Sequence, residues 1–404
     1  MGTGEIAWAL TATALVLFMT PGVAFFYGGL VKAKSVVSMM MMSFGALGLI
    51  TVLWILFGAN MSAVNGVWDF AGNPFSDIGL GSADNEALIG SAYGATFAII
   101  TVALISGAIA DRAKFGSWLL FAGLFALLVY FPVAAWVWGG GWILNLGTSL
   151  GLSTEVIDYA GGTAVHINAG AAALALALVL GKRIGFAKGI SKPHNVPLVL
   201  LGAAILWFGW FGFNAGAEWL NGLANVGLIM VNTLGATAAA ILGWLIVEKV
   251  KDGKATSVGA ASGAVAGLVA ITPACANLEP GWALLLGAVA GAVCAMAIEM
   301  KFKFGFDDSL DVVGIHLVGG LIGTLYLGFF AIDTGLFMGG DGTQLLAQAI
   351  AAFAVMIYSF VLAYIIGFAI EKTIGFRVKN EDEIAGIDTV VHGEEGYVLA
   401  DGKA

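Results

Sequence analysis

Two of the four histidines in this 404-residue chain stand in segments that are otherwise apolar. His166 lies in "GGTAVHINAG", which is followed by "AAALALALVL" without a charge, and His316 lies in "DVVGIHLVGG". A polar ring buried in hydrocarbon is costly unless its nitrogens find partners, so it indicates function by default. An imidazole offers a donor and an acceptor and can carry a proton near neutral pH.

The two histidines share a local pattern, because Asp158 precedes His166 by eight residues and Asp308 precedes His316 by eight. Each ring could simply bond to a neighbouring helix, an interaction worth about 0.6–2 kcal/mol in membranes. The repetition favours the alternative, in which two inward-facing rings meet at one site.

Other kinds of chemistry have no support in the sequence. There is no phosphate-binding loop, and no GxGxxG motif follows a strand. Two histidines without a thiolate or carboxylate set make a poor metal site, and Cys275 and Cys294 do not suggest one or a disulfide framework. We therefore predict a protein that is not an enzyme and has no cofactor and no metal.

The composition indicates a polytopic all-α membrane protein. Hydrophobic residues make up 60% of the chain and charged residues 11%, whereas soluble domains carry roughly 25% charged residues. Many of the 59 glycines recur inside apolar runs, where small residues let helices approach closely. The net charge of -9 argues against nucleic acid as a partner. The bilayer is the expected surroundings.

Apolar stretches of about 20 residues predict eleven transmembrane helices. They lie near residues 6–31, 36–60, 87–110, 115–136, 160–180, 196–217, 225–248, 256–273, 281–300, 310–331 and 344–371. These spans define a transport domain, 1–372, and a tail, 373–404. His166 and His316 fall in spans five and ten, as an inverted repeat of spans 1–5 and 6–10 plus an eleventh helix would place them.

The charges alternate between the two sides of the predicted bundle. All 17 basic residues follow odd-numbered spans: Lys32, Lys34, Arg112, Lys114, Lys182, Arg183, Lys188, Lys192, Lys249, Lys251, Lys254, Lys301, Lys303, Lys372, Arg377, Lys379 and Lys403. The alternate loops carry acidic residues such as Asp69 and Asp77 and no basic ones. The positive-inside rule then predicts a multi-pass cell-membrane protein with its N-terminus outside and its C-terminus in the cytoplasm.

Aromatic residues gather at the predicted outer side. "VYFPVAAWVWGGGW" brings Tyr130 and Trp138 to the outer end of span four, and Phe97 and Phe213 lie on the outward halves of spans three and six. Most of the 12 tryptophans fit an interfacial aromatic belt. Aromatic faces also attract small cations without a fixed negative charge, which makes Trp138 a candidate recruitment residue.

Several longer segments resemble the signature segments of the ammonium transporter family (Amt, with Mep and Rh relatives), in its prokaryotic Amt form. They are "TPGVAFFYGGLVKAKS", "DYAGGTAVHINAG", "WFGFNAG" and "DDSLDVVGIHLVGG", and the likeness runs from about Thr20 into the tail "FRVKNEDEIAGIDTVVHGEEGYV". The resemblance implies a homotrimer with one pore per subunit.

The resemblance also implies roles for individual residues. Those at the outer cation site are Trp138, Phe97, Ala217 and Asp158; those of the gate and pore are Tyr93, Tyr130, Phe213, Trp210, His166 and His316. Asp158 would support the architecture of the outer site, and it can also serve as an N-cap for span five. Two positions depart from the family pattern: Ala217 stands where many members carry a serine, and Tyr93 stands where phenylalanine is common.

These parts predict an ammonium transporter. Ammonium is recruited at the aromatic vestibule and deprotonated, because a bare ion is expensive in an apolar pore, and ammonia passes the imidazoles with net ammonium (electrogenic) movement. Alternatives are a passive ammonia channel or an ammonium sensor, although a tail of about 33 residues is short for a fused signalling domain. The tail reads as solvated, while the resemblance implies that a PII-type signalling protein binds there.

Overall fold

The computed structural model describes residues 1–64, 70–186 and 192–397, and in this part of the chain helices are joined by turns and irregular segments, without a β-strand. The predicted Asp69, Lys188 and Lys403 and the end of the tail lie outside these ranges. The helices are α1 (Thr3–Leu30), α2 (Val36–Leu53), α3 (Ala59–Met61), α4 (Asn85–Ile105), α5 (Phe115–Phe125), α6 (Phe131–Val137), α7 (Leu146–Leu150), α8 (Asn168–Leu180), α9 (Val196–Ala215), α10 (Val226–Asp252), α11 (Ser257–Ile271), α12 (Pro280–Ala297), α13 (Met300–Phe304), α14 (Val318–Phe330), α15 (Thr343–Thr373) and α16 (Asn380–Ala385).

Ten helical stretches in the described ranges are long and apolar enough to cross a membrane, and they match ten of the eleven predicted spans. The exception is the predicted span 256–273, where α11 has 15 residues and ends at Ile271, just before Pro273. Fifteen residues rise about 22 Å, less than the ~30 Å of a bilayer core. Because nearly every α11 residue from Gly259 onward is buried in the protein, the length of this helix is set by its neighbours.

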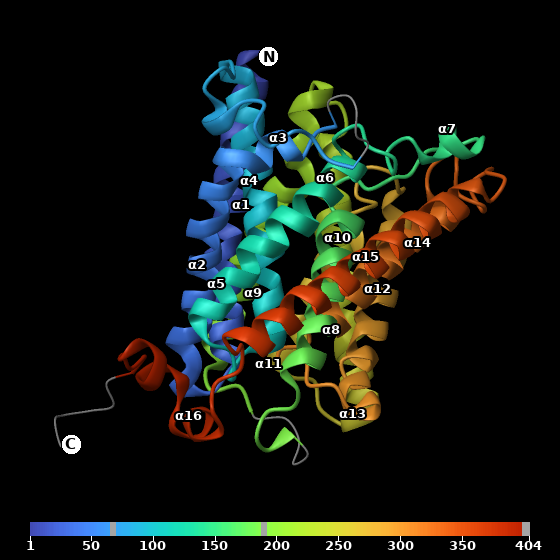
Figure 1. The fold of residues 1–404 in the computed structure, drawn as a ribbon. Coiled ribbons are helices and arrows are strands. Elements are labelled where there is room, and N and C mark those ends of the chain that lie inside the picture. The colour runs from blue at the N-terminus through green and yellow to red at the C-terminus, as the bar shows by residue number, and fades with distance from the viewer. Residues whose placement is uncertain (65–69, 187–191, 398–404) are drawn as a thin grey trace.

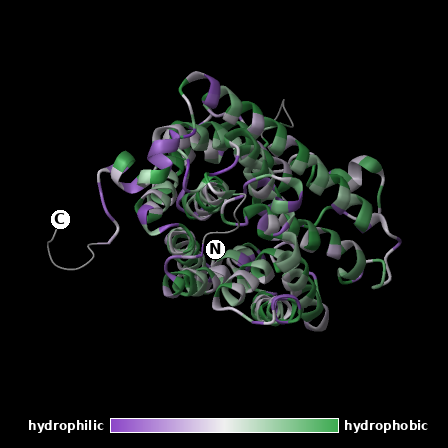
Figure 2. Cartoon of the chain, turned by 90° about the horizontal axis from the view of Figure 1, so that it is seen from below, coloured by the Kyte–Doolittle hydropathy of each residue, from purple (hydrophilic) through white to green (hydrophobic). Residues whose placement is uncertain are grey.

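The bundle has two distinct ends (Figure 1). The N-terminus and the loop before α4 lie at the upper end in this view, and α16 lies at the lower end. The 31-residue α15 runs diagonally across the bundle. At about 46 Å it is longer than the hydrocarbon core, and a long helix accommodates by tilting. Seen from below, the helices are mostly hydrophobic along their length and hydrophilic residues collect in connecting segments and near the tail (Figure 2).

Two glycines bring together the segments that carry the histidines. A Cβ at Gly170 of α8 would lie 2.5 Å from the backbone nitrogen of Leu317, next to His316. A Cβ at Gly320 of α14 would lie 3.0 Å from the carbonyl oxygen of Gly162. A side chain at either position would push the helix away from the π-helical turn that carries the other histidine, so the close packing expected from the glycine content sets the position of the site here.

The tail packs against the lower end of the bundle. The Asp388 carboxylate accepts from the amides of Val37 and Ser38, at 3.0 and 2.7 Å, at the start of α2. Arg377 pairs with Glu383 at 2.7 Å, and Glu383 accepts from the amide of Ile184. The tail is therefore attached to the connecting segments at this end over residues 377–388.

Candidate functional site

The two histidine rings meet in the middle of the bundle. His316 Nδ1 and His166 Nδ1 lie 3.2 Å apart, and the ring centroids are 5.3 Å apart with 23° between the planes. Both residues are at most 3% exposed. A hydrogen bond between two neutral imidazoles needs one donor and one acceptor, so the rings hold different tautomers. One Nε2 then carries a proton while the other Nε2 is a bare acceptor.

The same local backbone device holds each ring. His166 lies in a π-helical turn, Gly162–Ile167, and His316 lies in another, Val313–Leu317. The Asp158 carboxylate accepts from the amides of Gly161, Gly162, Thr163 and Ala164 at 2.6–3.0 Å. The Asp308 carboxylate accepts from the Val313 amide at 2.7 Å. The equal spacing in the sequence thus corresponds to equal roles at the start of the two helices, with unequal numbers of hydrogen bonds.

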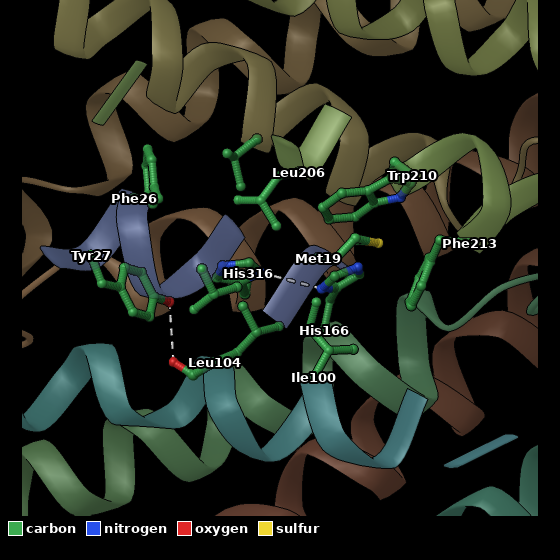
Figure 3. A pocket seen from close by; sticks show the side chains of 12 residues that line it. Met19, Phe26, Tyr27, Ile100, Leu104, His166, Leu206, Trp210, Phe213 and His316 are labelled. Atoms are coloured by element: carbon green, nitrogen blue, oxygen red, sulfur yellow. Dashed lines mark hydrogen bonds between the residues drawn. The ribbon is translucent and has the colours of Figure 1, made fainter. Parts of the chain in front are cut away.

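A narrow apolar cavity surrounds the histidine pair (Figure 3). It measures about 10 Å³, which is room for about one water-sized molecule. Trp210 and Phe213 lie towards one end of the cavity, and Phe26 and Tyr27 lie towards the other. The lining is Met19, Val23, Phe26, Tyr27, Ile100, Leu104, His166, Leu206, Trp210, Phe213, Val265 and His316. The imidazoles are therefore the main polar groups available to a molecule in this cavity.

His166 is fixed on its other side by aromatic packing. Its ring is stacked on Trp210, with centroids 5.4 Å apart and 17° between planes. The Trp210 indole donates to Thr272 Oγ1 at 2.8 Å. His166 Nε2 has no hydrogen-bond partner among the described residues. A buried nitrogen without a partner is costly, which makes it a binding point for a small polar molecule in the cavity.

A second, wider cavity opens above the first. This vestibule measures about 750 Å³, and its lining includes Trp138, Tyr93, Tyr130, Ala217 and Phe97. Phe213 lines both cavities. Its ring is stacked on Phe97 with centroids 4.1 Å apart, so this aromatic pair separates the vestibule from the histidines.

Around that stack, Trp138 of the predicted outer site and Tyr93 of the predicted gate pack against Phe97. Phe97 contacts Tyr93 at 5.0 Å and Trp138 at 5.9 Å between ring centroids. The Trp138 indole donates to the Asp158 carbonyl at 2.8 Å. Asp158 is 7% exposed and is not part of the vestibule lining, so its carboxylate holds the helix start and its carbonyl holds Trp138. Burial raises the pKa of Asp158 above its ordinary value, against the effect of the four amides.

Two residues near the vestibule were not predicted from the sequence. Tyr159 lines it, and its hydroxyl donates to the Glu218 carboxylate behind it. Glu218 is fully buried. The available signal for Glu218 was in "FNAGAEWL", where an acidic residue directly follows the predicted span 196–217.

Ion pairs connect the segments that precede and follow the helices of the histidine pair. Arg183 bonds to Asp307 at 2.9 Å and to Asp111 at 3.0 Å, and Arg112 donates to the Asp307 carbonyl at 2.6 Å. This network ties the segment before His316 to the ends of the stretches that carry α4 and α8. Burial lowers the pKa of Arg112 to about 10 despite Asp307 nearby, and Arg112 is held by these acceptors.

The fold and the two cavities define a multi-pass helical membrane protein with a pair of polar rings inside a narrow apolar cavity. Residues 7–397 match the Ammonium Transporter Family, and the chain belongs to that family. It is 51% identical over 441 residues to the ammonium transporter of Mycobacterium tuberculosis (strain ATCC 25618 / H37Rv), covering 98% of this chain and 91% of that protein. It is 40% identical to ammonium transporter Amt1 of Archaeoglobus fulgidus, covering 98% of this chain and 100% of that protein. These relatives are named as transporters.

Solved structures show the same fold. Mep2 of Candida albicans superposes with a TM-score of 0.84 at 31% identity, over 95% of this chain and 88% of that chain. A structure titled "Sensor Amt Protein" superposes with a TM-score of 0.85 at 27% identity, over 96% of this chain and 97% of that chain. The family predicted from the sequence motifs is therefore confirmed.

Proposed function

We propose that this protein moves ammonium from the vestibule past the histidine pair to the opposite end of the bundle. The contact between His166 and His316 is the observation that carries the proposal. Trp138, with Phe97 beside it, binds the cation through its ring face, and the stack of Phe97 on Phe213 opens to admit it. Tyr93 and Tyr130 line the approach, and Trp210 lines the path beyond.

The narrow cavity favours a neutral molecule over an ion. Its walls are apolar, so a dehydrated ammonium or potassium ion would lose far more hydration energy than the walls return. Ammonium can leave its proton behind and enter as ammonia, whereas potassium cannot. The one protonated and one bare Nε2 offer ammonia both an acceptor and a donor. A proton that follows along the paired rings makes the net movement electrogenic; ammonia passing alone, as in a passive channel, would carry no current.

The proposed assembly and topology follow the sequence pattern. Eleven crossings arranged as an inverted repeat, spans 1–5 and 6–10, plus one further helix put the vestibule outside and the basic loops in the cytoplasm. In this arrangement α11 crosses inside the protein, shielded from lipid by its neighbours. Residues 1–372 form the transport domain of a homotrimer, and the cytoplasmic tail from 373 onward is the docking region for a PII-type protein. Sensing is the second candidate function, favoured by the likeness to the structure titled as a sensor.

The test is ammonium current across liposomes that contain the purified protein. His166→Leu should insert and assemble but lose current, because the partner ring loses its hydrogen bond and the proton path is broken. His166→Asp or His166→Glu should keep some current and admit potassium, since a carboxylate can compensate a dehydrated cation. A fully active and selective His166→Leu would return both histidines to a packing role. Ammonia uptake without current in the wild-type protein would favour the passive channel, and no uptake would favour sensing.

A further inference from the structure

The vestibule lining includes the polar residues Asn60, Ser62, Asp77, Ser91 and Asn221. At its floor, the part beside the Trp138 and Phe97 rings, it offers a dehydrating cation aromatic faces but few free hydrogen-bond acceptors. Ala217 contributes only a methyl group there. The Trp138 indole is a donor and is already bonded. The Tyr93 hydroxyl donates to the carbonyls of Gly212 and Phe213 and is packed against Gly216, where a Cβ would lie 2.3 Å from its oxygen. An ammonium ion that sheds water at this floor needs acceptors for its N–H groups.

Tyr159 is the lining residue that is placed to supply one. It is partly exposed, whereas Tyr93 is buried. Its backbone amide is fixed to the Pro273 carbonyl at 3.1 Å. Its hydroxyl proton is donated to Glu218 Oε1, so the lone pairs of the phenol oxygen remain available to accept a hydrogen bond.

Glu218 adds a negative charge directly behind this hydroxyl. It is fully buried and accepts from the Asn225 amide at 2.8 Å and from Asn221 Nδ2 at 3.4 Å. None of the described basic residues forms an ion pair with it. A hydrogen bond to a charged acceptor polarises its donor, and the resulting chain of hydrogen bonds is cooperative. The charge of Glu218 thus acts on the vestibule through Tyr159.

We propose that Tyr159 is a cation-binding residue of the vestibule and that Glu218 sets its strength. The phenol donates its proton to Glu218, and the phenol oxygen accepts an N–H of ammonium beside the Trp138 ring. Tyr159 contacts the substrate, and Glu218 is a positioning residue that polarises it. The pair supplies the acceptor that the methyl group of Ala217 cannot. This inference rests on the proposed transport of ammonium and names the residues that capture it.

The experiment measures liposome current against ammonium concentration for intact, purified protein. Glu218→Gln removes the charge and keeps the size, and Tyr159→Phe removes the oxygen and keeps the ring. Each should raise the half-saturating ammonium concentration about fivefold, equivalent to about 1 kcal/mol, with the maximal current unchanged. The half-saturating ammonium concentration of the double variant should be no higher than that of the more impaired single variant, because Glu218 acts through Tyr159. Ala217→Ser added to Tyr159→Phe should recover part of the affinity.

Glu155→Gln is the matched control. Glu155 is an acidic residue of the outer loops that accepts from the amides of Gly147 and Thr148 and does not line the vestibule, so its removal should leave the half-saturating concentration unchanged. An unchanged value in Tyr159→Phe, or a Glu218→Gln that only lowers thermal stability, would overturn the inference. If Glu218→Gln does not fold, Tyr159→Phe alone decides. Absence of current in the wild-type protein would instead count against the proposed function.

Discussion

Asparagine substitutions at Asp158 and Asp308 should have very different effects on stability. Both aspartates stand eight residues before a histidine and begin the helix that carries it. The Asp158 carboxylate serves four backbone amides, whereas the Asp308 carboxylate accepts from one, and its Oδ1 has no partner among the described residues. The sequence offset is the same, but the number of hydrogen bonds at stake differs.

The magnitude follows from the acceptor capacity of each side chain. An asparagine has one acceptor oxygen, so at position 158 it can serve two of the four amides, and its NH₂ group faces the other two donors. A buried amide without a partner costs about 1–3 kcal/mol, which predicts a loss of about 2–6 kcal/mol for Asp158→Asn. At position 308 the asparagine oxygen can keep the Val313 amide, so the predicted loss is under about 1 kcal/mol.

The assay is thermal inactivation of the two purified variants, followed by size exclusion in parallel with the wild-type protein. The temperature at which Asp158→Asn loses its assembled form should be several degrees lower than the corresponding temperature for Asp308→Asn. Its half-saturating ammonium concentration should also rise, because a disturbed helix start would displace the Asp158 backbone carbonyl that holds Trp138. Equal inactivation temperatures for the two variants would refute the reasoning from hydrogen-bond counts.

Three further predictions address topology, recruitment and pH. A cysteine at Asp77 should be labelled by an impermeant thiol reagent in intact cells and one at Lys254 only after permeabilisation; the reverse would invert the proposed orientation. Trp138→Ala should raise the half-saturating ammonium concentration roughly five- to thirtyfold, for about 1–2 kcal/mol of cation–π binding, and an unchanged value would exclude this ring as the recruitment site. Burial raises the pKa of Asp308 from 3.8 to about 6, so its contribution to stability is present below pH 4 and is lost as the pH rises through 6, by about 3 kcal/mol. Asp308→Asn should therefore flatten the dependence of thermal stability on pH between 4 and 7, and an unchanged slope would show that other groups dominate.

The positions of the helices were largely predictable because a bilayer makes a strong demand on sequence. Each lipid-facing span needs about 20 apolar residues, and within the described ranges ten such stretches appear where hydropathy placed them. This length requirement does not apply to a helix that is surrounded by other helices. In α11 small residues dominate, and its length is fixed by packing and by Pro273, so a hydropathy window overestimates it.

The contact between His166 and His316 was predictable from their repeated surroundings, but its form was not. The equal offset from an aspartate suggested equal places in the fold. The direct Nδ1 contact depends on π-helical turns and on the approach of Gly170 to Leu317, and hydropathy carries no signal for either. The Tyr159–Glu218 pair was missed for a similar reason, since a charge count separates sides of a membrane but does not show which charges are buried.

The two π-helical turns place the histidine side chains in the narrow cavity. A π turn widens the helix by one residue, and such turns frequently occur at functional sites. Here each turn carries a histidine and is followed by a regular helix, α8 or α14, whose glycines hold the pair together. The distance between the rings is thus set by backbone contacts of small residues and by Asp158, none of which lines the narrow cavity. A cavity of about 10 Å³ leaves room for little more than one small molecule beside them, so a shift of either helix would change the shape of this cavity even with both imidazoles in place.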